Sequence, residues 1–232
     1  MTKRPEAVMT RKKILSVSVR LFLTQGYRQT SVSQIVEEAG VARGSFQNFF
    51  PTKDCILKEL VISVFGSQFV SARALTANAP SPICEYAAET AIQLAITELN
   101  ENLRELYLEA YSVPDIAEFI YLNTSAELKR IFGAYHPGYS DCDFYETDIG
   151  TSGIMRNYMA RKCDIHFPLE RKIDRFITAA LRVLNVPADE FDMVMSFVKK
   201  LDIRQIANDV IERLFTLFEV KFDFTLSKSE ET

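Results

Sequence analysis

Glycine and proline are scarce in this 232-residue chain, with eight of each, and no stretch of any length alternates apolar with polar residues. A half-buried sheet needs such alternation in its strands and turn residues between them. Apolar residues instead recur at spacings of three and four along nearly the whole chain, which is typical of helices with one buried face. The sequence therefore predicts an all-α protein.

Residue types that build common metal and catalytic sites are also few. The chain has two histidines and four widely spaced cysteines without a C-x-x-C pair. It contains no nucleophile elbow, no glycine-rich phosphate loop and no Glu-x-x-His pair of a diiron bundle. We therefore expect no metal, no cofactor and no catalytic residue, and we expect the cysteines to be reduced and mostly structural.

Long uncharged apolar runs are missing as well. None approaches the roughly 20 residues that cross a bilayer, and no charged segment followed by an apolar one resembles a secretory leader. The sequence therefore predicts a cytoplasmic protein without a membrane partner.

Charge is distributed unevenly between the first quarter of the chain and the rest. Residues 1–53 carry nine basic and three acidic side chains, a net charge of +6, whereas residues 54–232 carry 18 basic and 28 acidic ones, a net charge of −10. An acidic body with a basic N-terminal end is typical of a protein whose N-terminal end meets a polyanion. A basic arm that is merely solvated has the same pattern, so charge alone leaves both interpretations open.

Apolar periodicity and boundary residues divide the N-terminal part into short helices. Gly26 and Gly40 are expected to end helices, and Pro51 to break one. Ser31 with Gln34 three residues later has the pattern of a capping box. The sequence therefore predicts helices over about residues 8–25, 32–39, 43–50 and 53–78.

The third of these helices has one apolar face and one small, polar face. Phe46, Phe49 and Phe50 fall on one side of a helical projection and are expected to pack inward. The other side has no large apolar group and carries Arg43, Gly44, Ser45, Gln47 and Asn48. Two short helices joined by a tight turn, the second with a polar outer face, form a helix-turn-helix, whose second helix enters the major groove of DNA.

The side chains on the polar face suit base recognition. Gln47 and Asn48 can form paired hydrogen bonds with adenine, Arg43 can reach guanine or phosphate, and Gly44 allows close approach of the backbone. Thr30, Ser31 and Ser33 at the start of the second helix either contact phosphate or act only as caps. Lys53 at the start of the fourth helix either binds phosphate or is a solvated lysine. The predicted DNA contacts are Thr30, Ser31, Ser33, Arg43, Gly44, Ser45, Gln47, Asn48 and Lys53.

The stretch "ILSVSVRLFLTQGYRQTSVSQIVEEAGVARGSFQNFFPTKDCILKEL" resembles the DNA-binding domain of the tetracycline-repressor (TetR) family of transcriptional regulators. The chain departs from the family pattern at Ala42, where the helix usually opens on Ser or Thr, and at Gln47 and Phe49, where tyrosines are common. The resemblance implies a helix-turn-helix domain over residues 1–55 and a helical effector-binding and dimerisation domain over residues 56–226.

The body is expected to consist of further helices, and residues 227–232, which have no apolar anchor, to form a disordered tail. Whether the segment 133–153 is helix or loop is left open by the glycines within it. Expected helices span about residues 82–99, 101–112, 115–134, 143–163, 168–185, 188–200 and 202–222.

Aromatic residues are frequent in the part of the body where family members form their effector pocket. Any single one of them is more often plain core than a ligand contact. Together with Met155 they suit a small apolar or aromatic molecule held by shape and a few hydroxyl hydrogen bonds. The predicted ligand contacts are Phe65, Phe69, Tyr107, Tyr111, Phe119, Met155 and Tyr158.

The last expected helix is apolar around more than half of its circumference, which is too wide for one core-facing stripe. The outer side is covered either by a second subunit, as the resemblance implies, or by residues 168–200 of the same chain. The predicted dimer contacts are Ile206, Val210, Leu214 and Leu217.

These observations together favour a homodimeric, ligand-responsive regulator, a repressor that binds double-stranded DNA at an inverted-repeat operator. The alternative is a helical enzyme or small-molecule carrier whose N-terminal domain is an interaction module.

Overall fold

A computed structural model of the chain describes residues 3–218, with side chains from residue 6 onward. In this part of the chain there are eleven α-helices, one 3-10 turn and no strand, which confirms the predicted all-α class. The helices are α1 Lys3–Gln25, α2 Val32–Ala39, α3 Arg43–Phe49, α4 Lys53–Leu75, α5 Ile83–Leu99, α6 Glu101–Ala110, α7 Pro114–Phe132, α8 Asp141–Ala160, α9 Leu169–Val183, α10 Ala188–Val198 and α11 Ile203–Leu217.

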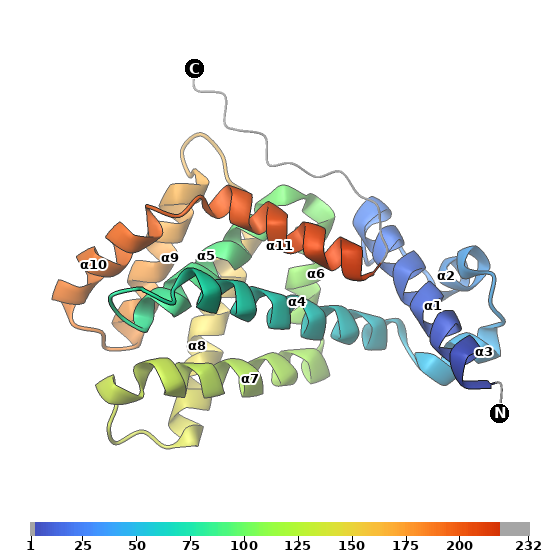
Figure 1. The fold of residues 1–232 in the computed structure, drawn as a ribbon, viewed down its shortest axis with the longest axis horizontal. Coiled ribbons are helices and arrows are strands. Elements are labelled where there is room, and N and C mark those ends of the chain that lie inside the picture. Colours follow the sequence, from blue (N-terminus) through green and yellow to red (C-terminus); the bar gives the residue numbers. More distant parts are fainter. Residues whose placement is uncertain (1–2, 219–232) are drawn as a thin grey trace.

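Helices α1–α3 form a small unit at one end of the molecule, which we call the head (Figure 1). Ile14 and Phe22 of α1, Ile35 of α2 and Phe46 of α3 are fully buried, and Phe50 directly after α3 is 1% exposed. These side chains lie on the inner faces that the apolar spacing predicts, so burying them fixes α2 and α3 across α1. The head is therefore a helix-turn-helix whose buried residues are continuous with the core of the body.

The boundaries of α2 and α3 follow from local capping. Ser31 accepts a hydrogen bond from the backbone of Gln34, whose side chain in turn accepts from Ser31 N, so the predicted capping box is confirmed. Gly40 ends α2 in the left-handed region, with φ of 57°. Ala42 opens α3 without a side-chain hydrogen bond, as its methyl group dictates. That helix start keeps free N–H groups.

Helices α4–α11 form the larger unit, which we call the body, and α5 runs through its centre. Fourteen of the 17 residues of α5 are buried, because α4, α6, α9, α10 and α11 all pack around it. Helix α4 connects the head to the body (Figure 1). It is long and apolar enough to cross a membrane by length and composition, but Ile56, Leu57 and Leu60 on it are buried in the core.

The observed helix limits differ from the predicted ones in a few places. Helix α1 begins five residues earlier than expected, and α4 ends at Leu75. The undecided segment resolves into a 3-10 turn, Gly133–Tyr135, a short loop, and α8, in which Gly150 and Gly153 lie inside the helix. The predicted tail, residues 227–232, and the end of the last predicted helix lie outside the described residues.

Candidate nucleic-acid interface and effector pocket

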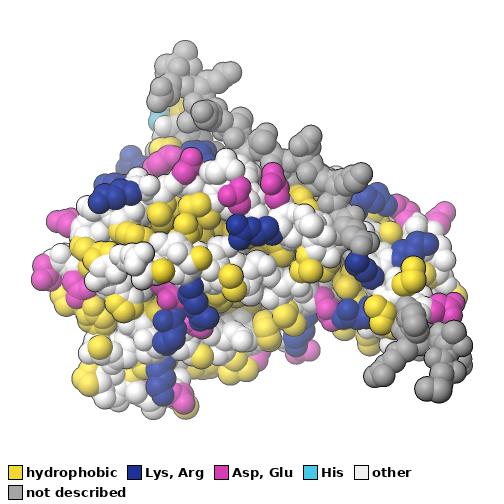
Figure 2. Space-filling view, viewed as in Figure 1, with side chains coloured by type: hydrophobic (Ala, Val, Ile, Leu, Met, Phe, Trp, Pro, Cys, Tyr) yellow, Lys and Arg dark blue, Asp and Glu magenta, His cyan; other side chains and the backbone are white. Residues whose placement is uncertain are grey.

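The outer face of α3 is exposed where the sequence predicts contacts to DNA. Arg43, Gly44, Gln47 and Asn48 are exposed and Ser45 is half-buried. Figure 2 shows Lys and Arg side chains over the α1–α3 end of the molecule, with acidic side chains among them. Because the phenylalanines of α3 hold its other side against the head, this polar face is fixed in orientation and points outward.

Open space surrounds Gly44. A Cβ atom added there would meet no atom of the protein within 4 Å, so nothing inside the head requires a glycine at this position. The missing side chain therefore leaves room outside the head, where a partner's backbone can approach.

Arg43 differs from several other cations of the head in having no carboxylate partner in the described part of the chain. Arg11 pairs with Glu59, and Arg20 pairs with Glu38. The Nε of Arg28 donates to Glu109 of the body at 2.6 Å. Part of the positive charge counted in the sequence is therefore compensated internally, and the charge of Arg43 is available to a phosphate or a base.

The predicted contact at Thr30 is wrong for a structural reason. Thr30 is 1% exposed, its hydroxyl donates to Gly26 O at 2.7 Å, and it accepts from Gln25 Nε2 at 3.1 Å. A hydroxyl that is buried with both roles satisfied cannot reach DNA. Ser31 and Ser33 are exposed, so their phosphate contacts stay predictions.

The ammonium group of Lys53 is partly buried and already bound within the protein. Its Nζ donates to Tyr27 O at 2.7 Å and to Thr30 O at 2.9 Å, and it lies 4.0 Å from the centre of the Tyr27 ring. Partial burial lowers the pKa of this ammonium, against the nearby carboxylate of Asp54, which raises it. Lys53 therefore braces the loop between α1 and α2, and its contact to phosphate stays a prediction.

The same loop is bound from the other side by α6. The carboxylate of Glu105 accepts from the backbone N–H groups of Tyr27 and Arg28, both at 3.1 Å. Asn102 Nδ2 donates to Leu23 O at 2.8 Å, which satisfies a carbonyl in the last turn of α1. The start of α6 is thus a polar clamp on the head, and any displacement of α6 moves the end of α1.

Gly26 is required at this clamp, since its φ is +93° and an added Cβ would lie 2.5 Å from Glu105 Oε2. We expect Gly26→Ala to lower the free energy of unfolding by at least about 1–2 kcal/mol from the left-handed backbone alone. Gly66→Ala in the middle of α4 is the matched control, because nothing lies within 4 Å of its added Cβ and alanine favours a helix by about 0.5–1 kcal/mol. The midpoint of urea unfolding should therefore fall for Gly26→Ala and rise for Gly66→Ala. Equal shifts of the two midpoints would contradict this role of Gly26.

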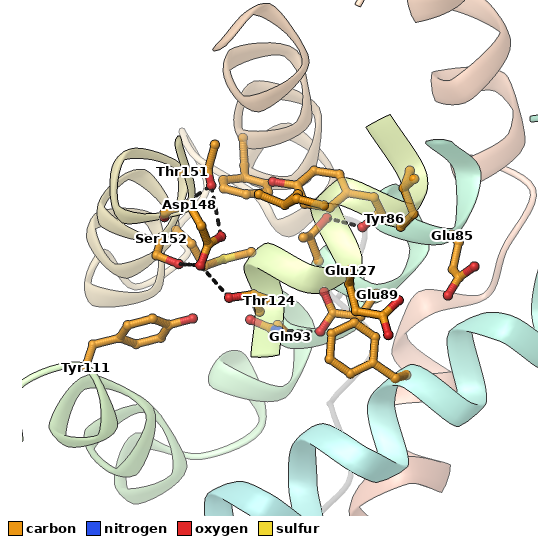
Figure 3. Close-up of a pocket in the computed structure, with 16 residues that line it drawn as sticks. Glu85, Tyr86, Glu89, Gln93, Tyr111, Thr124, Glu127, Asp148, Thr151 and Ser152 are labelled. Carbon is orange, nitrogen blue, oxygen red and sulfur yellow. Dashed lines mark hydrogen bonds between the residues drawn. The ribbon is translucent and has the colours of Figure 1, made fainter. Parts of the chain in front are cut away.

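A pocket in the body, which we call the acidic pocket, is lined by sixteen residues from α4 to α9 (Figure 3). Its walls combine aromatic rings with carboxyl, amide and hydroxyl groups. The lining residues are Phe69, Glu85, Tyr86, Glu89, Thr90, Gln93, Tyr111, Thr124, Glu127, Leu128, Ile131, Asp148, Thr151, Ser152, Met155 and Phe176.

Two acidic side chains lie deep in this pocket. Glu89 is 4% exposed, and burial raises its pKa to about 8 against a hydrogen bond from Gln93. Asp148 is also 4% exposed, and burial raises its pKa to about 6 although the hydroxyls of Thr124, Thr151 and Ser152 donate to it. Both carboxyls bind protons more tightly than they do in water, which is typical of acids without a basic neighbour.

A second cavity, which we call the apolar cavity, lies where α1, α4, α6 and α11 meet. It is lined by Val19 and Leu23 of the head and by apolar residues of the body. Tyr111 lines both this cavity and the acidic pocket. The end of α6 therefore separates two hollow regions, whereas its start clamps the head.

The predicted ligand residues divide between these hollows. Phe69 and Met155 line the acidic pocket, Phe65 and Tyr107 line the apolar cavity, and Tyr111 lines both. Phe119 and Tyr158 line neither of the two. Sequence reasoning missed Glu89, Gln93 and Asp148. The signal for the first two was an acid and an amide four residues apart, which places both on one face of a largely apolar helix.

The predicted dimer contacts need correction at two positions. Val210 is 1% exposed and Leu214 is 4% exposed within their own chain, in which α11 packs against α5 and α4. The outer side of α11 instead carries half-buried Ile206 and Leu217, which is 58% exposed. The broad apolar stripe is therefore partly core, and only its outer part is available to a second subunit.

Comparison with known protein families agrees with the geometry of the head. Residues 14–60 match the model of the N-terminal domain of bacterial regulatory proteins of the tetR family. Among curated proteins, the chain is 29% identical over 94 residues to the uncharacterised regulator YuxN of Bacillus subtilis and 40% identical over 57 residues to AcrR of Shigella flexneri. These matches cover 40% and 25% of this chain, and 30% and 26% of the relatives.

Solved structures extend the likeness to the body at the level of the fold. The resorcinol complex of RolR superimposes with a TM-score of 0.64 at 18% identity, covering 84% of this chain and 96% of that one. CprB of S. coelicolor A3(2), described as a TetR family protein, gives a TM-score of 0.51 at 15% identity, covering 88% and 99%. The body therefore shares the fold of these proteins.

Proposed function

We propose that this chain, a member of the TetR family by its N-terminal DNA-binding domain and its all-α fold, is a cytoplasmic homodimeric repressor controlled by a small-molecule effector. The observation that carries the proposal is the outer face of α3. Four residues of that face are exposed, polar or small, and held outward by buried phenylalanines. In a helix-turn-helix this face enters the major groove.

The residues of α3 have distinct roles in this proposal. Gln47 and Asn48 read base edges, Arg43 binds a guanine or a phosphate, and Gly44 admits the DNA backbone. The uncapped N–H groups at the start of α3 are further donors for a phosphate.

Effector binding reaches the head through α6. Tyr111 at the end of this helix lines the acidic pocket, and Glu105 and Asn102 near its start hold the loop after α1. Ten residues of helix span only about 15 Å and are stiff over that length. A ligand that displaces the end of α6 therefore moves the clamp and changes the position of α3 relative to its DNA.

The alternative of an enzyme or carrier with an N-terminal interaction module has less support. The curated relatives that match the head are described as transcriptional regulators, and the polar face of α3 offers side chains suited to bases rather than a pocket for a substrate.

Selection of duplexes from a random library, followed by gel-shift titration, tests the DNA-binding role. We expect an inverted repeat to be selected, and we expect Gln47→Ala to relax base preference at one symmetric pair of positions, at a cost of about 1–3 kcal/mol there. Arg43→Ala should flatten the dependence of log K on log salt by about one unit if it contacts phosphate.

Arg171→Ala is the control for the salt dependence, because Arg171 is exposed on α9, far along the chain from the head. It should bind DNA as the parent protein does. Selected sequences that are identical for the parent protein and Gln47→Ala would show that Gln47 does not read bases. A library that yields no enriched duplex would count against the regulator itself.

A further inference from the structure

The acidic pocket contains an excess of negative groups. Four carboxyl side chains line it, and in the described part of the chain no Lys, Arg or His lines it. The four are Glu85, Glu89, Glu127 and Asp148 (Figure 3). An interior with several acids requires cations or protons to offset their charge.

Two of the four acids are neutralised from outside the pocket. Arg73 binds Glu85 at 3.1 Å and Glu127 at 2.5 Å, and Arg130 binds the same two carboxylates at 2.6 and 2.8 Å. Both arginine side chains are nearly half exposed, so they lie at the protein surface and form a closed network with these two acids. They leave Glu89 and Asp148 without a salt bridge.

The two remaining acids differ in their neutral partners. Asp148 accepts hydrogen bonds from three hydroxyl groups, whereas Glu89 accepts one from the Nε2 amide of Gln93, one turn further along α5. The other atom of that amide, Gln93 Oε1, is buried and has no hydrogen-bond partner in the described part of the chain. Gln93 itself is only 3% exposed and lines the pocket.

A buried acceptor without a donor is costly, and native structures contain few of them. Here an unsatisfied amide oxygen and an unpaired carboxyl lie side by side on one wall of a cavity (Figure 3). Both groups accept hydrogen bonds, and neither carries a donor hydrogen once Glu89 has lost its proton. The complementary ligand must therefore supply several donors and a positive charge at one point.

We propose that the acidic pocket takes a small organic ammonium ion with an aromatic or apolar body, whose N–H groups donate to Glu89 and Gln93 Oε1. This inference rests on the proposed function and names the chemical class of its effector. A primary ammonium brings three donors in a compact group. Phe69, Tyr86, Tyr111 and Phe176 supply the aromatic walls, which attract both the cation and a ring attached to it.

The proposal replaces the largely apolar effector expected from the sequence. A ligand without donors would cover Glu89 and Gln93 and leave both unsatisfied, and an anion would meet the carboxyl groups of Glu89 and Asp148 without a compensating cation. A neutral alcohol satisfies one acceptor and leaves the charge unpaired. The order of affinity is therefore ammonium, then alcohol, then carboxylate for one and the same carbon skeleton.

Matched probes test this order on the full chain without DNA. Benzylamine, 2-phenylethylamine and 1-naphthylmethylamine are compared with the corresponding alcohols by isothermal titration calorimetry and by thermal shift at neutral pH. We expect at least one amine to bind at least about tenfold more tightly than its alcohol, a difference of about 1.4 kcal/mol. Its binding should also release protons to the buffer, because the arriving cation ionises Glu89.

Two variants distinguish the pocket from general attraction to an acidic protein. Glu89→Gln keeps a hydrogen-bonding partner for Gln93 and removes the charge, so the preference for the amine and the proton release should both disappear. Glu146→Gln makes the same substitution of an amide for a carboxyl group at an exposed position of α8 and should behave as the parent protein. Equal binding of amines and alcohols, no binding by any amine, or an unchanged preference in Glu89→Gln would each overturn the proposal.

Failure here is separable from failure of the regulator. If the protein selects an operator but binds no amine, only the proposal of an ammonium effector is rejected. Amine binding without any enrichment of DNA would support the pocket and reject the repressor. When both are found, addition of the amine to the operator complex should weaken binding in the parent protein and have no effect on Glu89→Gln.

Discussion

Glu89→Gln is expected to make the protein markedly more stable than the parent chain at pH 8 and only slightly different at pH 5. Burial raises the pKa of Glu89 from 4.5 to about 8, so the folded protein holds this proton and the unfolded chain releases it. The stability that protonated Glu89 contributes is complete below about pH 4.5 and is lost as the pH rises towards 8. Each pH unit within that interval lowers the free energy of unfolding by about 1.4 kcal/mol, and the total is several kcal/mol.

Urea unfolding of the two proteins between pH 5 and pH 8 measures this difference directly. The other acids that face Glu89 are Asp148, Glu127 and Glu85, and the last two are held by Arg73 and Arg130, so their titration is common to both proteins. Burial raises the pKa of Asp148 from 3.8 to about 6, so the variant still loses some stability as the pH rises from 5 to about 6. Glu146→Gln should follow the parent curve, and parallel curves for all three proteins would show that Glu89 is ionised in the folded state.

A double variant, Ile206→Glu with Leu217→Glu, is expected to be a folded monomer that has lost high-affinity binding to the full operator. Both side chains lie on the outer side of α11, so the monomer can solvate the new carboxylates, whereas a subunit contact would bury them unpaired. A monomer holds one half-site, so we expect affinity for the inverted repeat to fall on the order of 100-fold or more. Analytical ultracentrifugation and gel shifts with full and half operators measure the two losses.

Leu122→Glu is the control for this double variant, since Leu122 is 57% exposed on α7 and gains a carboxylate away from α11. It should remain dimeric. A single Val210→Glu variant is a poor test, because Val210 is 1% exposed in its own chain and the change would unfold the monomer. If the folded double variant still sedimented as a dimer, the subunit contact would lie on another face.

Local sequence patterns were enough to predict the head. The spacing of Phe46, Phe49 and Phe50, the glycine stops and the Ser31 capping box each depend on residues within one turn of each other. The same spacing predicts that the outer face of α3 is polar and exposed, which the structure confirms for Arg43 and Gln47. These features follow from helix geometry alone, because a period of 3.6 residues assigns every side chain to a face.

Contacts between residues far apart in the chain decided the rest. Thr30 was predicted to contact DNA, but its hydroxyl donates to Gly26 O inside the head, and the predicted phosphate ligand Lys53 also donates to Tyr27 O of the loop after α1. Val210 was expected at a subunit contact and is covered by α5, which begins more than a hundred residues earlier. Glu89 and Gln93 are candidate ligand contacts only because residues of α7, α8 and α9 line the same pocket. In the described part of the chain, none of the lining residues is a cation. A sequence determines which groups a helix presents, and only the packing of helices decides which groups they meet.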